Sequence, residues 1–189
     1  YVKKNLKEKM RNEIVILNKF CKPAKVYWAE SYIQGFSGYG LECLIINYGS
    51  FEKTLKELIK VKDDRLVIDT KKYYNKKEVF FELNESKIHG PIILVDPTWK
   101  ERNVLSALSW DSFRKFQKYA SRFLKTPSEK FFYLEDFDED KFKQKADKKG
   151  KEFVKIVLKT DRQEGDIAGT KMRKFSKLLG EEIKKYFEI

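Results

Sequence analysis

Histidine, cysteine and long apolar runs are scarce in this chain, and each scarcity removes a class of site. The 189 residues include one histidine, His89, and two cysteines, Cys21 and Cys43. A serine or cysteine relay would have to use His89, yet no serine lies in a Gly-x-Ser-x-Gly turn. We therefore expect His89 to lie in a loop. Neither cysteine has a second cysteine or histidine at metal-ligand spacing, so both are expected to be core thiols.

Other familiar signals are missing too. No apolar run approaches the roughly 18 residues that cross a membrane, and no signal peptide opens the chain. These observations favour a cytoplasmic protein without a membrane partner. A Gly-x-x-x-x-Gly-Lys-Ser/Thr phosphate loop is absent. The acidic run 136–140 precedes an expected helix, where carboxylates more often compensate the helix dipole than bind a metal. The sequence predicts no catalytic residue and no metal ligand of its own.

Positive charge is what the chain has in excess. It carries 41 Lys and Arg against 29 Asp and Glu, which gives a formal net charge of +12. The excess lies in residues 1–125, with 25 basic and 15 acidic side chains, whereas residues 126–189 hold 16 and 14. Such a balance is typical of proteins that meet phosphate backbones, although lysine-rich surfaces also serve solubility. We expect a polyanion, most simply RNA, as the partner.

The hydrophobic pattern predicts an α+β fold whose first domain, residues 1–126, is helical with a small β element. Helices are expected over 5–22, from a Ser37 cap to Gly49, over 51–60 and over 110–124. Three β-rich runs, 66–68, 79–83 and 92–95, predict short strands. Thr126-Pro127 favours a domain boundary, because proline closes a helix and the charge balance changes there.

Residues 127–189 form the second expected domain. Their pattern predicts a strand over 131–134, a helix over 139–149, a strand over 153–158 and a helix over 170–187. This order suggests half of a ferredoxin-like α/β unit. Half a unit leaves a sheet face or edge uncovered, so we expect another segment or a second copy of the chain to pair with it.

A series of short motifs carries a family resemblance. The strongest runs are Gly35-Phe36-Ser37-Gly38-Tyr39 and Tyr48-Gly49-Ser50-Phe51, and further matches are Val67-Ile68-Asp69, Val95-Asp96-Pro97, Arg102-Asn103-Val104 and Pro127-Ser128. In this order the set resembles the archaeal, class I CCA-adding enzymes, which are tRNA nucleotidyltransferases. The resemblance spans residues 12 to 132. The remaining residues resemble the start of that family's body domain only loosely.

The resemblance implies that the catalytic groups and the segment matched here belong to different domains. In that family an N-terminal head of the polymerase-β type carries the carboxylates that bind Mg²⁺, and the segment matched here forms the neck and the beginning of the body. The chain also starts at Tyr1 rather than Met. We therefore expect the catalytic head in cis or on another chain, with tRNA, CTP and ATP as substrates.

The same resemblance suggests site residues. Tyr27 falls where the family places a tyrosine on the triphosphate, and Arg102 matches an arginine that reaches the base and the RNA end. The family's triphosphate-gripping lysine falls at Asn18, with Lys19 one position later and about 100° further round the helix. We therefore expect Tyr27, Arg102 and Lys19 to bind the nucleotide. Arg102, Lys22 and Lys25 are expected to bind RNA.

Two functions that involve RNA remain open from the sequence, beside an assembly role in which the second domain pairs with another chain. The chain is expected to be the substrate-binding portion of a CCA-adding enzyme that positions the tRNA acceptor end and the incoming CTP or ATP. Alternatively, it is a stand-alone RNA-binding module without nucleotidyltransferase activity, which the neutral side chain of Asn18 favours.

Overall fold

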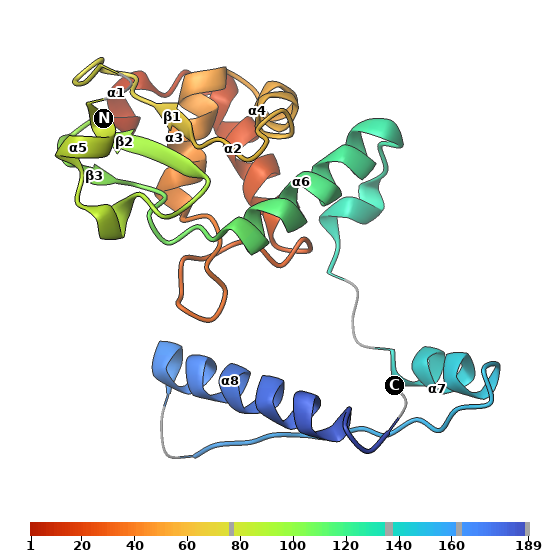
Figure 1. Cartoon of the computed structure of the whole chain (residues 1–189). Helices are drawn as coiled ribbons and strands as arrows, with labels where there is room; N and C mark the ends of the chain where they lie inside the picture. The colour runs from red at the N-terminus through yellow and green to blue at the C-terminus, as the bar shows by residue number, and fades with distance from the viewer. Residues whose placement is uncertain (76–77, 135–137, 162–163, 188–189) are drawn as a thin grey trace. The chain divides into compact units, whose positions relative to one another are not determined.

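The structure is a computed structural model that describes residues 1–75, 78–134, 138–161 and 164–187 (Figure 1). It divides into two compact units, Tyr1–Leu134 and Glu135–Ile189. Helices predominate among the described residues, together with one small sheet, which confirms the α+β class. None of the described helices is long and apolar enough to cross a membrane.

The N-terminal half of the first unit is helical, as predicted. Its helices are α1 (Val2–Asn5), α2 (Glu8–Cys21), α3 (Gly38–Tyr48) and α4 (Phe51–Leu58). Ser37 and Ser50 cap α3 and α4, because their side chains accept hydrogen bonds from the backbone N–H of Gly40 and Lys53 at 3.1 and 3.3 Å. Gly49, with φ of 89°, ends α3 in the left-handed conformation that glycine adopts most readily.

A three-stranded sheet comes next, with the order β1-β2-β3. Strand β1 (Leu66–Ile68) runs parallel to β2 (Ile92–Asp96), with Leu66 opposite Ile92, and β3 (Trp99–Asn103) returns antiparallel. All five residues of β2 are buried. The predicted strands at 66–68 and 92–95 are thus confirmed.

The strand predicted over 79–83 is wrong, because this run forms the short helix α5 (Val79–Glu82). Val79 and Leu83 are buried, four residues apart, while Phe81 between them is 88% exposed. That spacing fits one face of a helix rather than the alternate positions of a strand. Residues 85–87 then form a 3₁₀ turn, and exposed His89 lies in the following loop as expected.

The core of the first unit centres on Phe20. Its ring lies 5.3 Å from those of Phe51 and Phe123 and 5.0 Å from that of Tyr119, so α2, α4 and α6 (Trp110–Lys125) meet around one side chain. Figure 1 shows α6 running beside these N-terminal helices. Cys21 and Cys43 are free thiols buried in the same core, which confirms their predicted role.

The first unit continues beyond the proline at 127. The predicted strand over 131–134 is wrong, since Glu129–Phe132 form a 3₁₀ turn, η2. The rings of Phe131 and Phe132 both face Phe20, with centroids 6.4 and 5.7 Å away. Adjacent side chains of a strand would point to opposite faces, so a turn is required to place both rings in the core.

The second unit contains α7 (Glu139–Asp147) and α8 (Gly165–Ile183), where helices were predicted. Asp138 caps α7 by accepting a 3.0 Å hydrogen bond from the N–H of Lys141. The strand predicted over 153–158 is wrong: this segment has neither strand nor helix, and Val154 is 74% exposed. No described residue of 138–187 is buried. A strand forms only where a neighbour satisfies its backbone groups, so the predicted half ferredoxin-like unit does not arise from these residues alone.

Truncation tests where the first unit ends. A chain of residues 1–126 should lose about 3 kcal/mol of unfolding free energy relative to residues 1–134, because it lacks the partly buried rings of Phe131 and Phe132. Urea denaturation followed by circular dichroism measures the difference. Equal stability of the two truncations would contradict the assignment of η2 to the core.

Candidate nucleic-acid interface

The segment between α2 and α3 is folded back on itself by backbone hydrogen bonds. The N–H of Phe36 donates to the Val26 carbonyl at 2.8 Å, and the N–H of Trp28 donates to the Phe36 carbonyl at 2.9 Å. Gly35 is required here, since a Cβ at this position would lie 2.1 Å from the Val26 carbonyl oxygen. This closure fixes Tyr27 beside the first turn of α3.

Tyr27 is half-buried, and its hydroxyl lies next to α3. A Cβ on Gly38 would meet the phenol oxygen at 3.4 Å, so glycine leaves room for that hydroxyl. Among the described residues the hydroxyl has no hydrogen-bond partner. The Lys22 ammonium lies 5.4 Å from the centre of the Tyr27 ring, which is a cation–π distance. The pair therefore presents one cation and one free hydroxyl side by side, both of which suit a phosphate.

The end of α2 adds further positive charge. Lys19, Lys22 and Lys25 are all exposed, and no ion pair joins any of them to a described carboxylate. Lys19 and Lys22 are three residues apart and so share a helix face. Asn18 is half-buried, and its Oδ1 atom is buried without a hydrogen-bond partner in the described part of the chain. Exposure therefore favours Lys19 over Asn18 as a phosphate ligand.

Arg102 is held by a buried carboxylate. Its Nη1 atom lies 3.6 Å from Oδ2 of Asp96, which is 1% exposed at the end of β2, whereas half of the arginine side chain is exposed. The other oxygen, Oδ1, accepts hydrogen bonds from the Tyr39 hydroxyl at 3.1 Å and from the Thr98 N–H and hydroxyl at 2.8 and 2.7 Å. Asp96 thus joins α3, the β2–β3 turn and β3, and it leaves part of the guanidinium free.

Hydrogen bonding decides the charge of this cluster. Burial alone would raise the pKa of Asp96, but donation from Thr98 and Tyr39 and the nearby Arg102 charge lower that pKa below its ordinary value. Asp96 is therefore ionised at neutral pH. Burial, followed by the neighbouring Cys43 and Asp96, raises the pKa of the Tyr39 hydroxyl, so Tyr39 remains a donor. Burial likewise raises the pKa of Cys43 to about 11, which keeps it a neutral thiol.

Asn103 fixes the backbone next to Arg102. Its side-chain oxygen accepts from the N–H groups of Leu94 and Leu105, both at 3.0 Å, and its amide donates to the Lys87 carbonyl at 2.7 Å. Tyr39, Asp96 and Asn103 were not predicted as site residues. All three belong to the motifs that carry the family resemblance, and this was the only sequence signal for their supporting role.

Three of the predicted site residues, Tyr27, Lys22 and Arg102, lie around the first turn of α3. Tyr27 contacts Lys22 directly and α3 through Gly38, while Arg102 reaches the same turn of α3 through Asp96 and Tyr39. Lys19 and Lys25 flank Lys22 in sequence and are exposed. Within the described ranges, no group of three or more His, Cys, Asp or Glu side chains could hold a metal ion. These side chains can bind and orient phosphates and bases.

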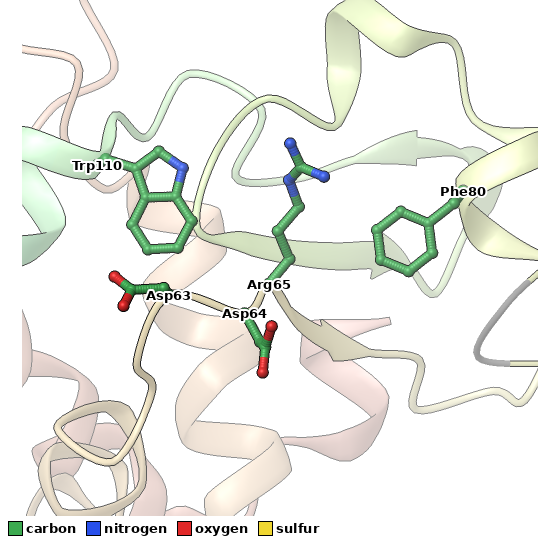
Figure 2. A pocket seen from close by; sticks show the side chains of 5 residues that line it. All are labelled: Asp63, Asp64, Arg65, Phe80 and Trp110. Atoms are coloured by element: carbon green, nitrogen blue, oxygen red, sulfur yellow. The ribbon is translucent and has the colours of Figure 1, made fainter.

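A separate hollow of about 490 Å³ lies elsewhere on the first unit. It is lined by Asp63, Asp64, Arg65, Phe80 and Trp110, none of which was predicted as a site residue. In Figure 2 the Arg65 side chain extends over the hollow, with Trp110 on one side and Phe80 on the other. Arg114 forms an ion pair with Asp63 at 2.6 Å and lies 5.6 Å from the Trp110 ring centre, so the Asp63 charge is paired.

Comparison with known proteins decides the family. The profile described as "tRNA nucleotidyltransferase, second domain" matches residues 12–133, which is more than half of the chain. The chain belongs to the tRNA nucleotidyltransferase family. The match contains most of α2 together with α3, the sheet, α6 and η2, so this tRNA nucleotidyltransferase second domain carries Tyr27, Lys22, Asp96 and Arg102.

Archaeal relatives agree with this assignment. The chain is 31% identical to the CCA-adding enzyme of Methanosarcina mazei over 98% of its own length and 39% of the relative's. It is 37% identical to that of Thermococcus kodakarensis over 70% of its length and 29% of the relative's. It is 38% identical to a Saccharolobus islandicus CCA-adding enzyme over 76% of its own length and 32% of the relative's. The chain thus spans about a third of the length of these relatives.

Substitution of Asp96→Asn tests the buried carboxylate. Because the folded-state pKa of Asp96 is lowered, its stabilising contribution is full above the unfolded pKa and is lost as pH falls through the folded value. At pH 7 the variant should be about 2 kcal/mol less stable, since its amide is neutral and places an NH2 group where Oδ2 pairs with Arg102. The gap should narrow from about pH 5 downward in urea titrations. The exposed Asp111→Asn serves as the control, and a gap independent of pH would contradict an ionised Asp96.

Proposed function

We propose that this chain is the substrate-binding portion of a CCA-adding tRNA nucleotidyltransferase, which positions the tRNA acceptor end and the incoming CTP or ATP for 3′-CCA synthesis or repair. The observation that carries the proposal is the arrangement around the first turn of α3. There Tyr27 with Lys22 and Arg102 with Asp96 contact one helical turn from two different segments of the chain. Membership of the tRNA nucleotidyltransferase family supports tRNA, CTP and ATP as the substrates of this arrangement.

Each side chain has a role that suits its chemistry. Tyr27 donates its hydroxyl to a phosphate oxygen of the nucleotide and Lys19 supplies the compensating charge, while Lys22 contacts the RNA backbone. Arg102 presents N–H groups in a fixed fork, which can serve a base edge and a phosphate together. Asp96 positions Arg102, and Lys25 adds charge for the RNA backbone. In this proposal the chain accelerates nucleotide addition by holding the reacting groups close together and correctly oriented, and it takes no part in making or breaking bonds.

Magnesium chemistry belongs to another part of the protein in this proposal. Asp96 is the carboxylate that pairs with Arg102. Its Oδ1 atom already accepts hydrogen bonds from Tyr39 and Thr98, and its Oδ2 atom already faces Arg102. Mg²⁺ requires oxygen ligands that are open to it, so this side chain does not fit the ion. We place the metal-binding carboxylates on a catalytic head domain, in cis or on another chain.

One observation favours a second function, that of an RNA-binding module without transferase activity. Asn18 stands where the family resemblance implies a lysine on the triphosphate, and its side chain is neutral and half-buried. Loss of this charge weakens the case for nucleotide binding while leaving the exposed lysines for RNA. The two functions differ in whether a head domain can restore catalysis.

Reconstitution of the chain with a catalytic head domain distinguishes the CCA-adding function from the RNA-binding module. The chain is mixed with the separately purified head domain of the Thermococcus kodakarensis relative and with tRNA that lacks its CCA end, and incorporation of labelled CTP is measured. We expect no incorporation by the chain alone and clear incorporation by the mixture. The head must first be shown to work with its own remaining domains. If it does so and yet fails with this chain, the RNA-binding module is the better account.

Two arginine variants provide matched controls for this assay. Arg102→Ala should reduce incorporation by about 100-fold, as expected for loss of a charged hydrogen bond to substrate. It should also lower the melting temperature, because buried Asp96 loses its ion pair, so incorporation is compared at a temperature where both variants are fully folded. Arg65→Ala removes the same charge from the hollow at Trp110 and should leave incorporation within about twofold of the unsubstituted chain. Equal losses in the two variants would mean that only net charge matters.

A further inference from the structure

Trp28 combines two features that seldom occur together. It has φ of 79°, in the left-handed region that side-chain-bearing residues avoid, and its side chain is 51% exposed. A bulky residue in this region costs free energy, and such residues persist only where the surroundings impose them. Burial of the indole does not provide the compensation, because half of it remains in contact with solvent.

The backbone holds Trp28 in this conformation from both sides. Its N–H donates to the Phe36 carbonyl and its own carbonyl accepts from the Gly35 N–H, both at 2.9 Å. As a result the indole projects from a fixed point. The Tyr27 ring meets it edge-on, with centroids 4.9 Å apart and planes at 63°. An edge-on neighbour does not cover the indole face as a stacked ring would.

Positive charge lies close to this ring. The Lys22 ammonium lies 6.0 Å from the Trp28 ring centre and 5.4 Å from that of Tyr27, and exposed Lys25 lies three residues before Trp28 in the sequence. A nucleobase can stack on an exposed aromatic face whatever its identity, and nearby ammonium groups suit the phosphate attached to it. An exposed aromatic ring among lysines is therefore a platform for single-stranded nucleic acid.

We infer that the face of Trp28 stacks against a nucleobase at the single-stranded 3′ end of RNA, with Lys22 and Lys25 on the adjacent phosphates. This inference rests on the proposed function and adds to it a residue that neither the motif matches nor the charge count identified. The stacked base lies next to Tyr27, so the platform holds the RNA end close to the triphosphate position.

Three variants of the full chain separate stacking from structure. Trp28→Gly removes the ring and also relieves the unfavourable φ. Gln34→Gly relieves a similar φ of 54° in the same segment but keeps the ring. Trp28→Phe keeps an aromatic face. Binding of a short single-stranded RNA that ends in cytidine, of CTP alone and of a blunt RNA duplex is measured for each, together with the melting temperature.

We expect Trp28→Gly to weaken single-stranded RNA binding by about tenfold while the melting temperature stays the same or rises. Gln34→Gly should leave affinity unchanged, and Trp28→Phe should retain most of it. Duplex and CTP binding should change little in any variant. A matching fall in melting temperature and affinity for Trp28→Gly would mean a structural role. A loss confined to CTP would overturn the RNA assignment.

Indole fluorescence reports the contact directly. With Trp99 and Trp110 both replaced by phenylalanine, Trp28 is the only tryptophan in the chain. Single-stranded RNA should quench its emission, since a stacked base lies against the ring. Absence of quenching despite RNA binding would overturn this inference and leave the proposed function standing. Absence of any RNA binding by the unsubstituted chain would overturn both.

Discussion

Asp96 is buried at the end of β2 and stays ionised because Thr98 and Tyr39 donate three hydrogen bonds to one of its oxygens and Arg102 pairs with the other. Through these contacts a single carboxylate connects α3, the turn after β2 and the exposed face of β3. A buried charge that is paired and hydrogen-bonded specifies one arrangement of its partners, since any displacement leaves it unpaired. The position of Arg102 relative to Tyr27 results from that arrangement.

The rest of the first unit serves to hold this turn of α3 in place. The aromatic cluster around Phe20 fixes α2 against α4 and α6, and Lys22, directly after α2, reaches the Tyr27 ring. Ser37 caps α3 and also donates to the Val104 carbonyl at 3.2 Å, which ties the helix to the segment after Arg102. A rigid frame of this kind can orient a phosphate and a base with little reorganisation on binding.

Sequence reasoning predicted most helices because serine caps and apolar periodicity are local signals. It misassigned residues 79–83 and 131–134 because a short apolar run fits a strand and a helical turn equally well, and only the core decides which neighbours must face inward. Tyr27 and Arg102 came from motif resemblance. Tyr39 and its partner Asp96 are 57 residues apart in the sequence, so no local pattern connects them. The positive φ of Trp28 is imposed by backbone hydrogen bonds to a later segment, so the local sequence does not predict it either.

The central claim is that the RNA interface lies around the first turn of α3 and not at the hollow beside Trp110. The three tryptophan indole N–H groups test it most directly by nitrogen–proton NMR, because Trp28 lies at the proposed interface and Trp110 lines the hollow. On titration with tRNA that lacks its CCA end, the account predicts that the Trp28 indole resonance shifts or broadens while that of Trp110 is unchanged. A shift of Trp110 with Trp28 unaffected would contradict it.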